Sequence, residues 1–97
     1  MLTGKQKRFL RAIGTELDPI VQVGKAGIAE NVILQAKEAL KAREIIKIRV
    51  LPNSDYVVKD AAQEIADKTN SELVQVIGRN FLLYKKSTKK DIIQLPN

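Results

Sequence analysis

The stretch from Gly24 to Gly27 is the part of this chain best suited to bind an anion. Two glycines three positions apart allow a sharp turn, and they leave no side chain between the main chain and an approaching ligand. A helical pattern begins directly after them, so the free N–H groups and the positive dipole end of that helix face the same place. Lys25 adds a charge at the tip of the loop. With a net charge of +6 on the chain, the predicted anion is a nucleic-acid phosphate.

A Gly-x-x-Gly segment can also be a plain strand-to-helix turn whose backbone needs positive φ twice. Two known phosphate loops are excluded, because no Gly-Lys-Ser or Gly-Lys-Thr follows and the third glycine of the dinucleotide fingerprint is absent. No Ser, Thr, Asp or Asn occupies positions 26 to 28, whereas Ser54 or Asp55 is placed to cap a later helix. We therefore expect the helix after the loop to begin with N–H groups that no neighbouring side chain satisfies, which favours a ligand.

Three further groups of basic residues could contact the same anion. The first group lies near the start of the chain, in the first turns of a predicted helix. Cations there interact unfavourably with the positive end of the helix dipole and repel one another. A negatively charged partner would explain that arrangement, although a solvated helix face is the alternative. The second group shares one side of a predicted strand and the third is a hairpin tip, where ordinary solvent exposure explains basic residues equally well. The three groups are Lys5, Lys7, Arg8 and Arg11; Lys47 and Arg49; and Arg79. Lys85, Lys86, Lys89 and Lys90 would add nonspecific attraction or solubility.

The composition excludes several classes of protein. There is no cysteine and no histidine, which removes disulfides, thiolate metal sites, the commonest general base and the commonest zinc ligand. No run of about 18 apolar residues occurs, and the first residues lack the apolar stretch expected of a signal peptide. Only four aromatic residues argue against a base-stacking platform. We expect no catalytic residue, metal, cofactor, small-molecule substrate or membrane, and we expect a cytoplasmic protein that is a monomer by default.

The chain length of 97 residues predicts one domain over 1–97, with 87–97 as a tail that the pattern does not place. Hydrophobic periodicity predicts helices over 2–13, 29–42 and from behind residue 55 to about 69, and strands over 20–23, 45–51, 72–77 and 81–86. Thr3 and Gln6 can form a capping box, and Asn70 can close the third helix. The helix faces predicted to be buried are Leu2, Phe9, Leu10 and Ile13; Ile28, Val32, Ala36, Ala39 and Leu40; and Val57 or Val58, Ala61, Ala62, Ile65 and Ala66.

The resulting order, αβαβαββ, predicts an α/β fold with a four-stranded mixed sheet. Helical crossovers between the first three strands favour parallel strands, and the final hairpin makes the last strand antiparallel. Polar residues alternate along the strands, so one sheet face is expected to be partly wet. We therefore predict a two-layer sandwich with helices mainly on one side.

These segments resemble the YhbY-like CRM domain, named for chloroplast RNA splicing and ribosome maturation. The resemblance covers essentially the whole chain and lies in the residues Leu2 to Leu10, Pro19 to Ile28, Ile46-Lys47-Ile48, Val76-Ile77-Gly78, Leu83-Tyr84 and Leu95-Pro96. It implies a fold similar to the C-terminal domain of translation initiation factor three. Bacterial members are stand-alone domains associated with precursors of the large ribosomal subunit, and plant members belong to group II intron splicing factors.

The resemblance also implies that the Gly24 to Gly27 loop contacts RNA, as the corresponding loop of KH domains does, although a KH loop joins two helices. We expect a non-enzymatic protein that assists assembly of the large (50S) ribosomal subunit by contacting pre-ribosomal RNA. Gly24 and Gly27 would shape the loop, and Lys25, the N–H groups around Ala26 and an adjacent basic N-terminal helix would hold phosphates. The alternative is a protein-interaction adaptor that docks on acidic patches of a ribosomal protein or an assembly factor.

Overall fold

The computed structural model describes residues 2–88 and 92–97, and its elements follow the predicted αβαβαββ order. The helices are α1 (Gly4–Gly14), α2 (Glu30–Arg43) and α3 (Val58–Thr69), and the strands are β1 (Pro19–Val23), β2 (Ile45–Val50), β3 (Glu72–Ile77) and β4 (Asn80–Tyr84). The capping box of Thr3 and Gln6 is present at the start of α1. Asn70 closes α3 with a left-handed backbone, at φ 55°. Element ends differ from the prediction by a few residues at most.

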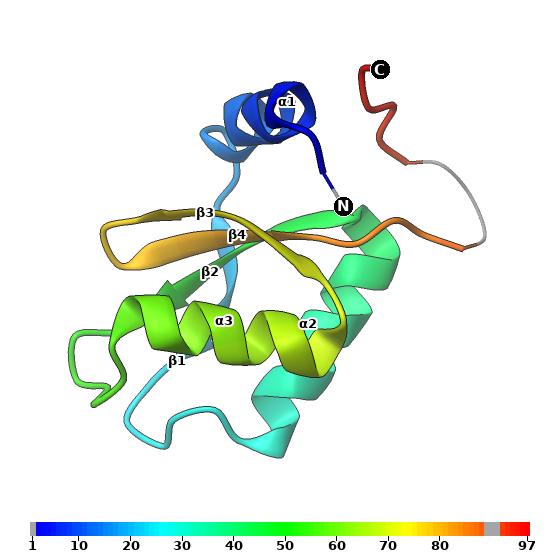
Figure 1. The fold of residues 1–97 in the computed structure, drawn as a ribbon. Coiled ribbons are helices and arrows are strands. Elements are labelled where there is room, and N and C mark those ends of the chain that lie inside the picture. Colours follow the sequence, from blue (N-terminus) through cyan, green and yellow to red (C-terminus); the bar gives the residue numbers. More distant parts are fainter. Residues whose placement is uncertain (1, 89–91) are drawn as a thin grey trace.

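The strand order in the sheet is β1-β2-β4-β3 (Figure 1). The pair β1–β2 is parallel, and β4 is antiparallel to both of its neighbours, β2 and β3. Strands β1, β2 and β3 therefore point the same way, which confirms the predicted mixed sheet. One consequence matters for function: the segments that follow these three strands all lie at the same end of the sheet.

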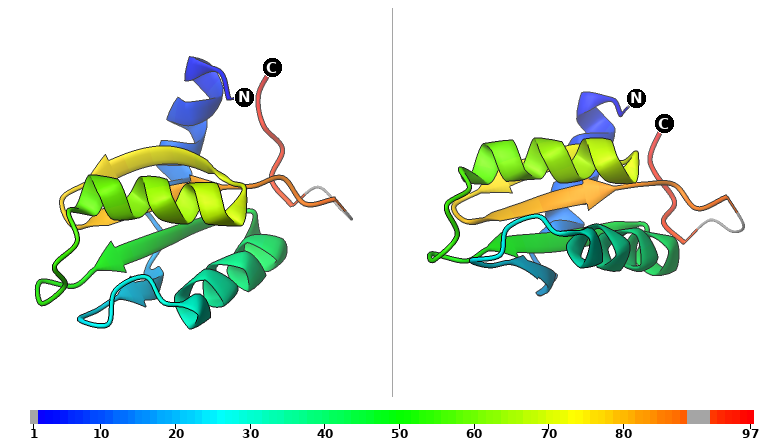
Figure 2. Two further views of the ribbon diagram at one scale, coloured as in Figure 1. Left: turned by 60° about the horizontal axis from the view of Figure 1, so that its bottom comes forward. Right: turned by 90° about the horizontal axis from the view of Figure 1, so that it is seen from below.

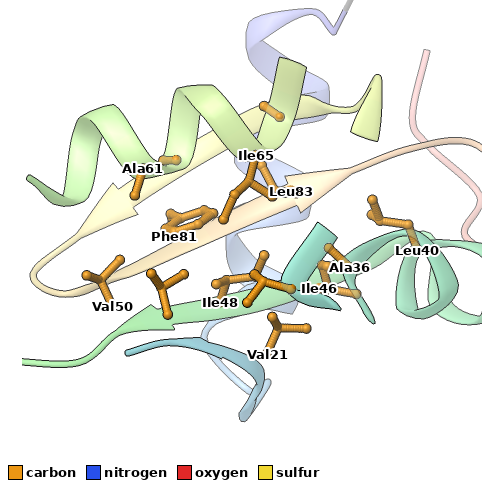
Figure 3. Close-up of a cluster of buried hydrophobic side chains, with 14 residues drawn as sticks. Val21, Ala36, Leu40, Ile46, Ile48, Val50, Ala61, Ile65, Phe81 and Leu83 are labelled. Carbon is orange, nitrogen blue, oxygen red and sulfur yellow. The ribbon is translucent and has the colours of Figure 1, made fainter. Parts of the chain in front are cut away.

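Helices α2 and α3 cover one face of the sheet and form the main hydrophobic core with it (Figures 2 and 3). Alternate residues of β2, namely Ile46, Ile48 and Val50, are buried there. The predicted faces of both helices pack on them, including the small side chains of α3 that allow a close approach to the sheet. Of the two alternatives at the start of α3, Val58 packs against the core and Val57 is exposed.

The opposite face of the sheet carries a smaller core beneath α1. Leu10 of α1 is buried against Ile45, Val74, Leu82 and Tyr84. A Cβ atom at Gly14 would lie 2.2 Å from Cδ1 of Leu82, so only glycine lets the end of α1 sit this close to β4. Phe9, which was expected on the buried side of α1, is 38 % exposed instead. Phe9 directly precedes the buried Leu10, so its side chain points about 100° away from that of Leu10 around the helix axis.

The remainder of this second face is open, which confirms the predicted wet face and the two-layer arrangement. The strand register places Gln22, Arg49, Asn80 and Ile77 side by side across the four strands. A second row, closer to α1, consists of Lys47, Leu82 and Gln75. Most of these side chains are polar, and α2 and α3 lie on the other side of the sheet.

The C-terminal segment is held by Glu44, which is fully buried at the end of α2. Its carboxylate oxygens accept hydrogen bonds from the main-chain N–H groups of Ser87 (2.6 Å), Ile92 (3.0 Å) and Ile93 (2.7 Å). The described parts of the segment contain no helix or strand. Glu44 therefore fixes a tail that the sequence pattern could not place. Lys89 and Lys90 lie outside the described residues.

Candidate nucleic-acid interface

The glycine loop joins β1 to α2 at the end of the sheet, with Lys25 and Ala26 exposed. The Gly27 N–H donates to the Gly24 carbonyl across 3.0 Å and closes the turn. Gly27 has a φ of +78°, but Gly24 is not among the glycines with positive φ. The turn interpretation, which required positive φ at both glycines, therefore accounts for Gly27 alone.

The surroundings of the two glycines differ in the same way. A Cβ atom at Gly27 would lie 2.9 Å from Cε2 of Tyr56, whose ring packs against the main core. A Cβ atom at Gly24 would lie 3.6 Å from Cδ1 of Leu51, which is an ordinary van der Waals contact. The fold thus requires glycine at position 27 and does not require it at position 24. At Gly24 the missing side chain leaves the main chain open to a ligand.

The start of α2 has no side-chain cap: its N-cap residue is Ala29, and Glu30 is the acid of the first turn. This matches the expectation, but the expected contrast with α3 is wrong. The N-cap residue of α3 is Val57, also without a side-chain cap, because the Ser54 hydroxyl accepts the Tyr56 N–H (3.3 Å) within the preceding loop. An uncapped helix start therefore does not distinguish α2, and the case for the loop rests on Gly24 and Lys25.

Arg79 lies at the same end of the sheet as the glycine loop. Its Nε donates to the Val50 carbonyl and its Nη2 to the Leu51 carbonyl, both at 2.7 Å. Leu51 in turn donates its N–H to the Val23 carbonyl, the residue before the loop. The guanidinium therefore ties the β3–β4 turn to the strand beside the glycine loop, and it remains only partly exposed. The structure thus gives Arg79 a stabilising role that the sequence did not reveal.

Lys47 and Arg49 project from β2 onto the open sheet face, as predicted. Arg49 is exposed and is paired in register with Gln22 of β1 and Asn80 of β4. Lys47 is partly buried and lies two residues closer to α1. Both side chains belong to a surface that leads from the end of the sheet near the glycine loop toward α1.

The basic residues of α1 do not lie beside the glycine loop. Lys5 and Arg8 are exposed and Lys7 and Arg11 are partly exposed, but α1 packs over the beginnings of β2 and β3, where its neighbours include Ile45. The loop follows the opposite ends of the parallel strands, and Figures 1 and 2 show α1 and the loop on opposite sides of the molecule. The expectation of one cradle formed by the loop and α1 is therefore wrong. The sheet separates them, since α1 needs an apolar surface for Leu10.

Two other features of the described residues bear on function. Within residues 2–88 and 92–97, no three side chains of the metal-binding types come together as a candidate ion site. In the same residues, every helix is too short or too polar to cross a membrane.

Comparison with known proteins identifies the family. Residues 2–85 match the profile of the CRS1 / YhbY (CRM) domain. The chain belongs to the CRM domain family. This confirms the resemblance noted in the sequence, and the match extends from the start of the chain to the residue after β4.

Bacterial relatives of this CRM domain are named for RNA binding. A Bacillus subtilis protein named "Probable RNA-binding protein YqeI" is 50 % identical over 96 residues, which are 99 % of this chain and 100 % of that protein. An "RNA-binding protein" of Haemophilus influenzae is 34 % identical over 95 residues, covering 98 % of this chain and 95 % of the relative. The solution structure of SAV1595 from Staphylococcus aureus, described as a candidate RNA-binding protein, matches this fold with a TM-score of 0.83. The two sequences are 48 % identical, and the match covers 99 % of this chain and 100 % of that one.

Proposed function

We propose that this CRM domain binds ribosomal RNA in precursors of the large (50S) ribosomal subunit and assists their assembly, as a non-enzymatic cytoplasmic protein. The names of its relatives, the net charge of +6 and the exposed glycine loop support this proposal. The proposal depends mainly on one observation: position 24 in this exposed loop is glycine, although the fold could accept a larger residue there. A close approach by a ligand explains its lack of a side chain.

The loop would hold RNA through its main chain and one charge. A phosphate oxygen can approach the backbone at Gly24, and the exposed ammonium of Lys25 pairs with the same or the next phosphate. Arg49 lies on the adjoining sheet face, and Lys47 follows it in the direction of α1. The RNA would therefore follow a path from the loop across the open sheet face to α1, and two separated regions of positive charge would bind it.

Salt dependence tests this electrostatic path. If about four to six phosphates are engaged, log K should fall with log salt at a slope of roughly −3 to −4 on single-stranded RNA. The slope can be measured by fluorescence anisotropy with a labelled oligonucleotide at several salt concentrations. A slope close to zero would contradict binding through phosphates.

A double substitution tests the loop itself. Replacing Lys25 and Ala26 by Asp should weaken RNA binding and leave the fold intact, because both side chains are exposed. The matched control replaces Lys41 and Ala42 by Asp, since this exposed Lys-Ala pair lies at the far end of α2 and receives the same change of charge. Equal weakening in both variants would indicate a general effect of net charge and would remove the loop from the site.

Nuclease treatment of a cell lysate separates this function from that of a protein adaptor. We expect the protein to co-migrate with large-subunit precursors and to leave them when the RNA is degraded. A protein that stays attached to a ribosomal protein or an assembly factor after nuclease treatment would contradict RNA binding as the main contact.

A further inference from the structure

The open sheet face contains a cavity of about 250 Å³ at the end of α1. Its apolar side chains are Leu82 of β4 and Ile77 of β3, while Lys47, Gln75 and Asn80 provide polar groups around it. Phe81 also borders the cavity, but its side chain belongs to the main core on the opposite face of the sheet. The last residues to line it, Gly14 and Thr15, close the side toward α1. The cavity lies between the two regions of positive charge assigned above to the RNA path.

Asn80 is the unusual residue of this cavity. Its Oδ1 is buried and has no hydrogen-bond partner among the described residues. Its neighbours in the register on this face are Arg49 and Ile77, and neither satisfies it. A buried acceptor without a partner lowers the stability of a folded protein, and native structures contain few of them. A ligand that donates a hydrogen bond at this position would remove that penalty.

The dimensions and chemistry of the cavity fit a single nucleobase. A base is flat, so one of its faces can lie on the apolar floor formed by Leu82 and Ile77 while its edge reaches Asn80 and Gln75. The amino and imino groups of bases are donors that suit a carboxamide oxygen. Lys47 in the cavity wall and the exposed Arg49 beside it can hold the phosphates on either side of the base.

We propose that this cavity takes one unpaired base of the bound RNA and that Asn80 recognises a hydrogen-bond donor on the edge of the base. The inference rests on the proposed function, and it adds base recognition to a contact that otherwise involves phosphates alone. The base must be unpaired because the Watson–Crick edge is occupied in a duplex, and readout of single-stranded bases is the usual route to sequence preference in RNA.

The test compares two single-stranded RNAs of equal length and charge, one complete and one with abasic positions. Asn80→Ala should weaken binding of the complete RNA by about tenfold, the usual effect of leaving one buried polar group without its partner, and should not change binding of the abasic RNA. The control Gln35→Ala also removes a carboxamide, but from an exposed position of α2 on the other side of the sheet. It should bind both RNAs as the unsubstituted protein does.

The stability of the free protein gives a second measurement. Asn80→Ala removes an unsatisfied acceptor, so its urea midpoint should equal or exceed that of the unsubstituted protein. A clear loss of stability would mean that the amide is already satisfied in the free protein, and it would overturn the proposal. The side-chain amide resonances of Asn80 and Gln75 should shift on addition of the complete RNA and stay in place with the abasic RNA.

The remaining outcomes separate this inference from the proposed function. If the Asp substitutions at Lys25 and Ala26 weaken RNA binding and Asn80→Ala does not, the base pocket is wrong and the RNA-binding function stands. If Asn80→Ala weakens binding of both RNAs equally, Asn80 acts without a base and the inference fails. An Asn80 amide that shifts with a ribosomal protein and not with RNA would assign the cavity to the adaptor function.

Discussion

Gly24→Ala and Gly27→Ala form a matched pair, because the structure assigns the two glycines different roles in the same loop. At Gly27 a methyl group meets two obstacles. The φ of +78° costs a residue with a Cβ about 1–2 kcal/mol. The Cβ would also lie 2.9 Å from the Tyr56 ring, and such overpacking costs roughly 1–3 kcal/mol. We expect Gly27→Ala to lower the free energy of unfolding by about 2–5 kcal/mol, which is a large part of the 5–15 kcal/mol typical of a domain.

Gly24→Ala meets neither obstacle. Its Cβ would make one ordinary contact, 3.6 Å from Leu51, and its φ is not positive. The free energy of unfolding should stay the same or rise by about 0.4–1 kcal/mol, because alanine restricts the unfolded chain more than glycine does. RNA binding should nevertheless weaken by about tenfold, since the methyl group occupies the space through which a phosphate oxygen would reach the main chain and one charge-assisted hydrogen bond of roughly 1.5–3 kcal/mol is lost or lengthened.

Two measurements decide the matter: urea unfolding followed by far-UV circular dichroism, and RNA binding followed by fluorescence anisotropy at one fixed salt concentration. The expected result is a crossed pattern, in which Gly24→Ala loses affinity without losing stability and Gly27→Ala loses stability. If Gly24→Ala binds RNA as tightly as the unsubstituted protein, no ligand approaches the backbone there, and the central observation behind the proposed function is removed. A destabilised Gly24→Ala would show that the fold does require this glycine.

Three further predictions concern other interactions of the fold. Glu44→Gln should destabilise the protein by about 2–3 kcal/mol in urea unfolding, because the carboxylate accepts hydrogen bonds from the main-chain N–H groups of Ser87, Ile92 and Ile93 at 2.6–3.0 Å. The control is Glu38→Gln at an exposed position of α2, which should change stability by less than about 0.5 kcal/mol. Arg79→Ala removes two hydrogen bonds of 2.7 Å to main-chain carbonyls and should cost roughly 1–3 kcal/mol, and a thermal midpoint equal to that of the unsubstituted protein would contradict its stabilising role. The pKa of Lys68 is raised above 10.5, chiefly by its hydrogen bond to Glu64. A lysine pKa that is higher in the folded than in the unfolded protein stabilises the fold at pH values below the unfolded pKa. Lys68→Gln should therefore lower the thermal midpoint slightly at neutral pH, and the difference should vanish as the pH rises well above 10.5.

The sequence by itself determined the elements of this protein and their order. The spacing of hydrophobic residues, the turn residues and the helix caps each depend on only a few neighbouring residues of the chain. The capping box of Thr3 and Gln6, the left-handed Asn70 and the buried face of α3 were therefore all predictable. The parallel direction of the first three strands was predictable as well, because helical crossovers impose it. The glycine loop and Lys25 were found as a candidate anion site for the same local reason.

The tertiary structure decided how those elements meet, because contacts between residues far apart in sequence leave no local pattern. Insertion of β4 between β2 and β3 places Arg79 against Val50 and Leu51. The choice of sheet face for α1 moves its basic residues away from the glycine loop. Gly24 and Gly27 look equivalent in the sequence. In the structure the positive φ at position 27 and the nearby ring of Tyr56, contributed by the loop after β2, make Gly27 necessary for the fold and leave Gly24 for a ligand. The buried oxygen of Asn80 likewise has no hydrogen-bond partner among residues 2–88 and 92–97 because of what the neighbouring strands place beside it.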